Sequence, residues 1–398
     1  MENNYSKIYL KHKKDNFVRR FHPWIFSGAI AKTDGYLDDG SIVEVYSNKD
    51  EFLAIGHYHR GSIAVKIFSY EKVIPDAEFW FNKLHKAFLI RQKLGFTKKG
   101  KSLAYRLVHG EGDGLPGLII DVYERTIVIQ AHSIGMYLSK GLITEALKKI
   151  YTNQIDIIYD KSKNSLPKDY AENIQNSYLW GTPKSSECII DENSCQFYVN
   201  WDSGQKTGFF LDQRDNRYLL KRFSEGKRVL NAFCYSGGFS VYALKAGAAE
   251  VHSVDSSAKA IEMVEKNILL NGLENLNHKS FKADVMKFLK EQDHSYDLMI
   301  LDPPAFAKTV SKRHKAVQAY KRLNIEGLKL VAKGGVLFTF SCSQVVDNQL
   351  FYNTVTAAAI EAKRKVRVLY RLTQPADHPV NIFHPEGNYL KGLVLYVE

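Results

Sequence analysis

After residue 197 the chain alternates between short apolar runs and segments with helical periodicity, and this alternation restricts the possible folds more than any other feature. Two of the apolar runs are Tyr-Asp-Leu-Met-Ile-Leu at 296–301 and Gly-Val-Leu-Phe-Thr-Phe at 335–340. Both end abruptly in proline or polar residues, the pattern of a strand that is buried on both faces of a parallel sheet. The alternation therefore predicts a doubly wound α/β domain.

The residues that follow these two strands are candidates for chemistry. Asp302 follows the first strand and precedes two prolines, whereas Cys342 follows the second and stands between two serines. Ligands bind at the carboxyl edge of open parallel sheets, so we expect both side chains to face one crevice. Taken singly, Asp-Pro-Pro is better explained as a strand terminator and Cys342 as an ordinary buried cysteine. Together, a thiol and a carboxylate are suited to covalent attack on an electrophilic ring.

A second group of residues predicts a site for an adenosine-bearing cofactor. The buried strand at 228–233 leads into Cys-Tyr-Ser-Gly-Gly-Phe-Ser at 234–240, where glycines at the start of a helix let a ligand approach the backbone. Asp255 and Asp284 follow the next two predicted strands, placed to bind a ribose diol and an adenine amino group. Each acid alone is more typical of a loop, but acids at successive strand ends favour the cofactor. The absence of Gly-x-Gly-x-x-Gly argues against NAD.

The first 150 residues have a different pattern. Short strands are predicted at 42–46, 52–58 and 63–68 and suggest a small barrel. After them we expect a helix from Ala77 to near Gly95, a second set of strands and a helix over 135–150, which suggest a small α+β region. The intervening glycine-rich segment 110–117 lacks the Gly-Lys-Ser/Thr ending of a phosphate-binding loop, so a hairpin turn is the better interpretation.

Positive charge is concentrated near the N-terminus. The formal net charge is +12, and residues 1–101 contain 18 Lys and Arg against 11 Asp and Glu. Such a surface favours a polyanionic partner, nucleic acid or an anionic membrane, over a merely soluble basic protein. Basic side chains beside aromatic ones are typical either of phosphate binding with base stacking or of a solvated surface over a core tryptophan. These residues are Lys13, Lys14, Arg19, Arg20, His22 and Trp24.

Cysteine usage and hydropathy indicate the compartment. The four cysteines have no Cys-x-x-Cys spacing, which argues against a zinc site, or any other metal site of that kind, and against a disulfide framework. No apolar run is long enough to span a bilayer, and the N-terminus does not resemble a signal peptide. A cytoplasmic protein with no membrane partner is therefore expected.

Three segments, 231–240, 301–306 and 339–343, resemble motifs of class I S-adenosylmethionine-dependent methyltransferases. With His-Pro-Trp-Ile-Phe-Ser-Gly at 22–28 and the segments 206–214 and 376–392, the chain resembles the RlmI-like family of bacterial 23S ribosomal RNA cytosine-5 methyltransferases nearly end to end. It departs from the family pattern at Ala305 and across 161–180.

The resemblance implies three domains. They are an N-terminal β-barrel PUA domain over 1–72, a small middle α+β domain with a linking helix over 73–190, and a C-terminal Rossmann-like methyltransferase domain over 191–398. It also implies S-adenosylmethionine as cofactor and S-adenosylhomocysteine as product. The implied substrate is ribosomal RNA or a large-subunit assembly intermediate, and the implied assembly is commonly a homodimer.

The resemblance also assigns site residues. It makes Cys342 the nucleophile and Asp302 the residue that binds ring nitrogen 3 or the exocyclic amine of cytosine. The basic and aromatic residues at 13–24 named above would bind RNA. The cofactor-binding residues would be Asn231, Phe233, Tyr235, Ser236, Gly237, Gly238, Asp255, Ser256, Asp284, Asp302, Gln213 and Arg214.

The chemistry of the ring explains the need for a thiolate. Carbon 5 of cytosine is a poor nucleophile until a thiolate adds to carbon 6 and makes carbon 5 enamine-like. A base must then remove the carbon 5 proton, and Asp377, His378 and Glu386 are weak candidates for that role. Three alternatives stay open: a methyltransferase for another atom, which needs no thiol, a non-catalytic RNA-binding assembly factor, and an NAD-dependent oxidoreductase.

Overall fold

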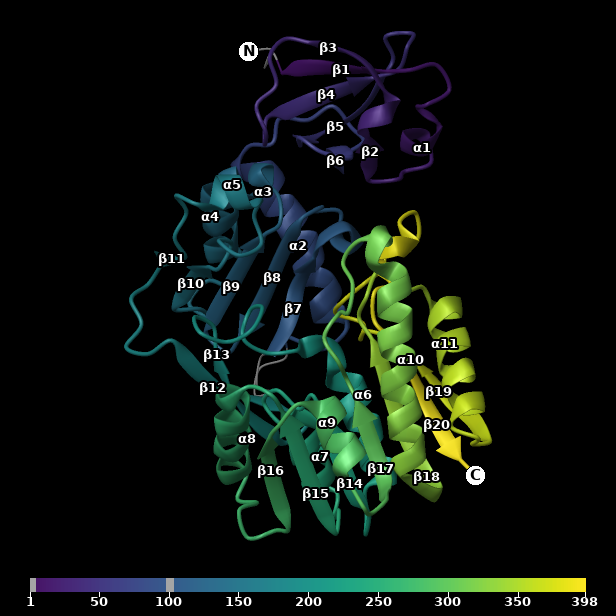
Figure 1. The fold of residues 1–398 in the computed structure, drawn as a ribbon. Helices are drawn as coiled ribbons and strands as arrows, with labels where there is room; N and C mark the ends of the chain where they lie inside the picture. The colour runs from purple at the N-terminus through teal and green to yellow at the C-terminus, as the bar shows by residue number, and fades with distance from the viewer. Residues whose placement is uncertain (1–4, 98–103) are drawn as a thin grey trace. The chain divides into compact units, whose positions relative to one another are not determined.

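The computed structural model describes residues 5–97 and 104–398 (Figure 1). The chain forms two compact units. The first unit comprises Met1–Ile190, Val199–Phe209 and Ala376–Gly387, and the second comprises Asp191–Tyr198, Phe210–Pro375 and Asn388–Glu398. Within the described parts of the chain, no helix is both long and apolar enough to cross a lipid bilayer.

The first unit begins with a six-stranded sheet of order β2-β6-β5-β4-β1-β3. Its pairs are antiparallel except for β1 and β4, and the predicted strands at 42–46, 52–58 and 63–68 are confirmed. Valine and isoleucine on alternate positions fill its core, because successive side chains of a strand point to opposite faces. The elements are β1 (Ser6–Leu10), α1 (Asn16–Arg19), β2 (Trp24–Phe26), β3 (Ile30–Asp34), β4 (Ile42–Tyr46), β5 (Phe52–Tyr58) and β6 (Ile63–Ser69).

A five-stranded sheet of order β11-β10-β9-β8-β7 follows in the same unit. The predicted helix after Pro75 is α2 (Ala77–Lys93), whose N-cap Asp76 accepts a hydrogen bond from the Phe79 N–H at 2.9 Å. The glycine-rich segment 110–117 joins the antiparallel strands β7 and β8, which confirms the hairpin interpretation. The strands are β7 (Ala104–His109), β8 (Leu118–Tyr123), β9 (Thr126–Ala131), β10 (Ile157–Asp160) and β11 (Ser177–Trp180).

The single helix predicted over 135–150 is wrong. Two helices occupy this region, α3 (Ile134–Leu138) and α4 (Lys140–Ile150), with Ser139 between them. The Ser139 hydroxyl donates to the Gly135 carbonyl at 2.9 Å, a local bond by which serine competes with the regular helical pattern. The short α5 (Lys168–Ala171) completes the helices of this part.

The second unit is built on a seven-stranded sheet of order β16-β15-β14-β17-β18-β20-β19. Its first five strands are parallel, as predicted, whereas β20 lies antiparallel between β18 and β19. The strands are β14 (Arg228–Ala232), β15 (Glu250–Asp255), β16 (His278–Lys282), β17 (Tyr296–Leu301), β18 (Val331–Ser341), β19 (Val366–Leu372) and β20 (Lys391–Val397). A two-stranded sheet of β12 (Glu187–Glu192) and β13 (Cys195–Asn200) precedes them in the chain.

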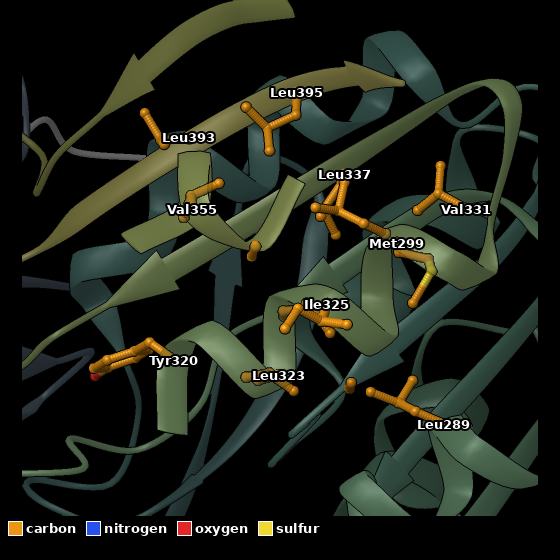
Figure 2. Close-up of a cluster of buried hydrophobic side chains, with 14 of the residues drawn as sticks. Leu289, Met299, Tyr320, Leu323, Ile325, Val331, Leu337, Val355, Leu393 and Leu395 are labelled. Atoms are coloured by element: carbon orange, nitrogen blue, oxygen red, sulfur yellow. The ribbon is translucent and has the colours of Figure 1, made fainter. Parts of the chain in front are cut away.

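Helices cover both faces of this sheet. One layer contains α6, α7 and α8, and the other contains α9, α10 and α11, each packed against its neighbours in the layer. Figure 2 shows the apolar core of this unit, to which Tyr320 and Leu323 of α10, Val355 of α11 and Leu337 of β18 contribute buried side chains. The helices are α6 (Arg214–Leu220), α7 (Gly238–Lys245), α8 (Ala258–Leu270), α9 (Val285–Glu291), α10 (Arg313–Leu330) and α11 (Asn348–Glu361).

Candidate active site

The sequence-predicted residues of the second unit gather at the carboxyl edge of β14, β15, β17 and β18. From β14 the chain builds β15 and β16 on one side and then crosses to β17 and β18 on the other. The edge beside β14 and β17 is therefore the topological switch point, where open α/β sheets bind ligands. The backbone joins the two loops there, since the Asp302 N–H donates to the Ala232 carbonyl at 3.5 Å.

The loop after β14 has an unusual backbone. Phe233, Tyr235 and Gly237 have positive φ angles of 60°, 45° and 76°. Such angles are costly for residues with a side chain, so surrounding contacts must hold them. The Tyr235 N–H donates to Asp255 Oδ2 at 3.1 Å, and Asp255 Oδ1 accepts the Ser257 N–H at 2.9 Å. Asp255 thus ties the first loop to the end of β15.

Helix α7 begins at this loop without a side-chain cap. Its N-cap is Gly237, which has no side chain to accept a bond from the first turn. A Cβ on Gly238 would lie 2.9 Å from Cδ of Arg217, so only glycine fits between α7 and that side chain. The first turn of α7 can therefore offer backbone N–H groups and the positive end of the helix dipole to an anion.

The other predicted cofactor residues lie in or near this edge with different partners. Asn231 is buried and donates to the Ser240 hydroxyl at 2.9 Å, whereas the Ser236 carbonyl accepts from Asn267 at 2.8 Å. Ser256 is exposed after β15. Asp284 is also exposed and caps α9 by accepting the Lys287 N–H at 2.9 Å.

Asp302 is bound by a glutamine and lies near a second carboxylate. Gln213 Nε2 donates to Asp302 Oδ2 at 3.0 Å, and Asn216 donates to Gln213 Oε1 at 2.7 Å, which fixes the amide orientation. Removal from bulk water, and secondarily the charge of Asp212, raise the pKa of Asp302 to about 7. Asp302 is therefore poised to exchange a proton near neutral pH.

Arg214 was predicted to bind the cofactor together with Gln213, but its side chain is directed towards Glu192. It is buried at the start of α6, and its Nε lies 3.7 Å from Glu192 Oε2. Arg217 binds the same carboxylate at 2.7 and 2.8 Å. The two arginines and Glu192 form a buried charged cluster under the first turn of α7.

Cys342 lies beside the residue that follows Asp302, at the neighbouring strand end where the sequence places it. Strands β17 and β18 are neighbours, and the Cys342 thiol donates to the Pro303 carbonyl at 3.9 Å. The thiol is partly exposed, whereas Ser341 and Ser343 on either side are buried. The Ser343 hydroxyl is held by the Tyr320 hydroxyl at 3.0 Å, so the backbone on either side of the thiol is well supported.

The residues predicted to bind RNA lie in the first unit. Lys13, Lys14 and Arg20 are exposed around α1. Arg19 forms ion pairs with Asp15, at 2.7 Å, and with Glu51.

The two aromatic members of this group have intramolecular partners. His22 Nδ1 lies 3.2 Å from the backbone of Trp24. The Trp24 indole N–H donates to Glu111 at 2.8 Å, and its ring lies 4.3 Å from that of His384. Trp24 therefore joins the six-stranded sheet to other segments of the same unit.

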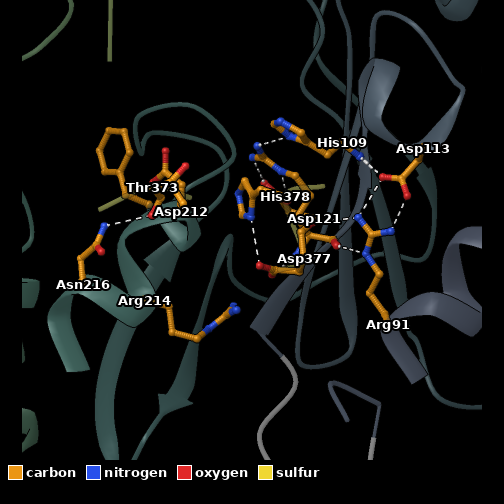
Figure 3. A network of polar contacts seen from close by, with 12 residues as sticks. Arg91, His109, Asp113, Asp121, Asp212, Arg214, Asn216, Thr373, Asp377 and His378 are labelled. Carbon is orange, nitrogen blue, oxygen red and sulfur yellow. Dashed lines mark hydrogen bonds and ion pairs between the residues drawn. The ribbon is translucent and has the colours of Figure 1, made fainter. Parts of the chain in front are cut away.

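The three candidate bases also lie in the first unit. Figure 3 shows Asp377 and His378 in a polar network with Arg91, His109 and Asp113. Asp377 Oδ2 accepts the Arg106 N–H at 3.0 Å, and Asp377 Oδ1 lies 3.0 Å from His378 Nδ1.

Both ends of this segment are held within the first unit. The Asp377 carbonyl accepts from Arg91 at 2.8 Å, and Glu386 Oε2 lies 3.8 Å from His384 Nε2. The Glu386 contact lies within the segment 376–387, whereas the Arg91 bond to Asp377 and the packing of His384 on Trp24 hold the segment in the first unit.

Comparisons with known proteins identify the family. The profile of the S-adenosylmethionine-dependent methyltransferase family matches residues 143–389, and that of PUA-like domains matches residues 8–70. A protein of Aeromonas hydrophila named ribosomal RNA large subunit methyltransferase I is 39% identical over 396 residues, covering 98% of this chain and 99% of the relative. One of the same name from Photobacterium profundum is 38% identical over 399 residues, covering 99% of this chain and all of the relative. This chain belongs to the ribosomal RNA large subunit methyltransferase I family.

A solved structure confirms the fold of this S-adenosylmethionine-dependent methyltransferase. A methyltransferase crystallised with S-adenosylhomocysteine superposes with a TM-score of 0.84 at 24% identity, covering 98% of this chain and 99% of the other. The predicted fold class, a Rossmann-like methyltransferase domain with an N-terminal PUA-like domain, and the predicted cofactor are thus confirmed.

The residues at the switch point fit this cofactor. A carboxylate at the end of β15, an uncapped helix N-terminus after β14 and a glycine pair without side chains are the donor and acceptor set that a ribose and an amino-acid carboxylate require.

Sequence reasoning assigned no role to three residues that act on this site. Asp212 raises the pKa of Asp302 and accepts a hydrogen bond from the Tyr389 hydroxyl at 2.6 Å. Lys391 approaches the loop after β18. All three stand inside motifs that carried the family resemblance, and that was the only signal for them.

Proposed function

We propose that this methyltransferase transfers a methyl group to carbon 5 of a cytosine in large-subunit ribosomal RNA through a covalent bond to Cys342. The observation that carries this proposal is the meeting of Cys342 with the residue that follows Asp302. The thiol lies 3.9 Å from the Pro303 carbonyl, so nucleophile and carboxyl group can face the same ring. The family name of the relatives supports ribosomal RNA as the substrate.

The cofactor site uses the switch point. Asp255 would bind the ribose hydroxyls, Asp284 the adenine amino group, and the first turn of α7 the amino-acid carboxylate. When bound, S-adenosylmethionine supplies an electrophilic methyl group on its sulfonium. The positive φ angles of Phe233, Tyr235 and Gly237 fix the shape of the loop that would border it.

The residues of this chain carry the remaining steps. The Cys342 thiolate forms a bond to carbon 6, and the displaced ring electrons reach nitrogen 3, where neutral Asp302 donates its proton. Carbon 5 is then an enamine carbon that accepts the methyl group. Loss of the carbon 5 proton to water restores the double bond between carbons 5 and 6 and breaks the sulfur–carbon bond, which returns Cys342 to the thiolate. Nitrogen 3 gives its proton back to the Asp302 carboxylate, so the base leaves neutral and Asp302 is protonated again.

The protonation state of Asp302 suits this role. Nitrogen 3 of neutral cytosine is an acceptor, so the carboxyl group must be protonated to assist the attack. A pKa of about 7 keeps a large fraction of Asp302 protonated at neutral pH, whereas an ordinary carboxyl would be almost fully ionised.

RNA binding and assembly complete the proposal. Lys13, Lys14 and Arg20 would contact phosphates, which supply affinity rather than sequence choice. The enzyme is proposed to act in the cytoplasm as a homodimer, and light scattering of the purified protein measures that stoichiometry.

The decisive experiment uses S-adenosylmethionine labelled in its methyl group and unmodified 23S RNA, with the nucleosides separated after digestion. We expect label in 5-methylcytidine with the wild type and none with Cys342→Ala. Cys188→Ala, another partly exposed cysteine in the other unit, is the matched control and should retain activity. Label in a different nucleoside, or label that survives Cys342→Ala, contradicts the proposal, and transfer to an exocyclic amine would give the second result.

A further inference from the structure

A buried lysine lies at the end of the strand that carries the nucleophile. Lys391 is the first residue of β20 and pairs in register with Ser341, which directly precedes Cys342. Its side chain is only 2% exposed. Its Nζ donates to the Ser343 carbonyl at 2.8 Å and to the Tyr389 carbonyl at 2.6 Å. The ammonium is therefore fixed against the backbone immediately after the thiol.

Two backbone carbonyl dipoles point at Nζ and favour its charged form, although a neutral amine could also donate both bonds. Carbonyl oxygens can only accept, so both bonds require N–H donors from the lysine. An ammonium has three donors, and these two carbonyls use two of them. Burial of a charged group is costly unless hydrogen bonds or an opposite charge compensate, so the position of Lys391 calls for a negative partner.

Three ionisable groups surround this part of the site. The charges of Cys342 and Asp347 favour the ammonium form, against burial, which lowers the pKa of Lys391 to about 8. The Tyr320 hydroxyl of α10 lies 3.0 Å from the Ser343 hydroxyl, and burial, with a smaller contribution from Cys342, raises the pKa of this phenol. Asp347 caps α11 by accepting the Leu350 N–H at 2.8 Å. Lys391 is thus a buried cation at the carbonyl of the residue that follows the thiol.

We propose that Lys391 is the positioning residue that holds Cys342 as a reactive thiolate. Its ammonium stabilises the sulfur charge before attack on carbon 6 and again when the sulfur–carbon bond breaks. The second role rests on the proposed cytosine mechanism, whereas the first is a property of the protein without RNA. A cation within about 4–6 Å lowers the pKa of an acid by roughly 1–3 units, so loss of this charge should raise that of Cys342 by a similar amount.

The first test measures the thiol directly, without cofactor or RNA. The rate of Cys342 alkylation by iodoacetamide is followed by peptide mass spectrometry between pH 6 and 10. In Lys391→Met we expect the midpoint of this profile to move to higher pH by roughly 1–3 units. Lys333→Met, the same change at an exposed position of β18, should leave it in place. An unchanged midpoint in folded Lys391→Met overturns the proposal.

Two further variants separate charge from packing. Lys391→Gln keeps an amide donor for the carbonyls but removes the charge, so it should shift the profile as Lys391→Met does even if the methionine variant does not fold. Lys391→Arg keeps the charge and should stay near the wild type. A shift in the arginine variant as large as that in the glutamine variant would assign the effect to packing and refute the electrostatic role.

Turnover gives a second readout and distinguishes the two proposals. Methyl transfer by Lys391→Gln relative to the wild type at the same pH should be at least tenfold lower at pH 7, and this ratio should rise towards pH 9, where the thiol of the variant ionises without help. Both proteins lose absolute turnover at pH 9 because Asp302 ionises, so the ratio is the readout. If Cys342→Ala still methylates RNA, the cytosine mechanism fails while the alkylation profile still decides the role of Lys391. If the alkylation profile of Lys391→Gln matches that of the wild type and Cys342→Ala loses the label, the cytosine mechanism stands and the proposed role of Lys391 fails.

Discussion

Replacement of Asp302 by asparagine should stabilise this enzyme above neutral pH while abolishing most of its activity. The pKa of Asp302 is raised from 3.8 to about 7 by burial and by Asp212. Between these two values the native state keeps a proton that the unfolded chain has lost, so the stability of the wild type falls as pH rises from about 4 through about 7. Asparagine carries no charge and avoids this loss.

The magnitude follows from the size of the shift. A change from 3.8 to about 7 is roughly three pKa units, and each unit corresponds to about 1.4 kcal/mol. The full effect is about 4 kcal/mol, and because the side chain keeps some contact with solvent we expect about 2–4 kcal/mol in favour of Asp302→Asn at pH 8. At pH 4 the two proteins should differ little.

Urea unfolding at pH 4.5, 6, 7 and 8, read by circular dichroism, measures this difference. Asp284→Asn is the matched control, since it makes the same change at an exposed N-cap where asparagine caps equally well. Turnover of Asp302→Asn should fall by roughly 10²–10³, because the group that protonates nitrogen 3 is lost. A stability difference that is the same at pH 4.5 and pH 8 would refute the reasoning.

Two further predictions concern RNA binding and the cofactor loop. The double variant Lys13→Ala, Lys14→Ala should bind 23S RNA more weakly and lower the slope of log affinity against log salt by roughly 1.5. Arg19→Ala removes a charge that is already paired, so it should change this slope less. Filter binding between 50 and 300 mM salt measures the slopes, and equal slopes in all variants would contradict the assignment. Gly237→Ala should cost about 1–2 kcal/mol for its φ of +76° and weaken S-adenosylhomocysteine binding in calorimetry, because a Cβ there also meets Val264 at 3.1 Å. Gly226→Ala, with φ of +67° and open space around it, is the control that should affect stability alone.

Local patterns predicted much of the fold and the place of the site. The apolar runs at 296–301 and 335–340 are strands because their side chains can be buried only on both faces of a sheet, and the residues after them necessarily lie at its edge. The break at Ser139 escaped prediction because the periodicity of 135–150 continues through it, and backbone bonds from Ser139 to Gly135 and from Ile143 to Ser139 run across it. The domain boundaries at 72 and 190 and the roles of the site residues stay predictions.

The sequence by itself determined the family, the parallel sheet and the presence of Asp302 and Cys342 at neighbouring strand ends. Each of these depends on residue type, short-range order or motif. Only the tertiary structure decided how those residues behave. Asp212 acts on Asp302 from a segment far along the chain, and Lys391 reaches the carbonyl of Ser343, beside Cys342, because β20 returns antiparallel beside β18. Charge and solvation depend on distances through space, and folding sets those distances between residues that the sequence keeps apart.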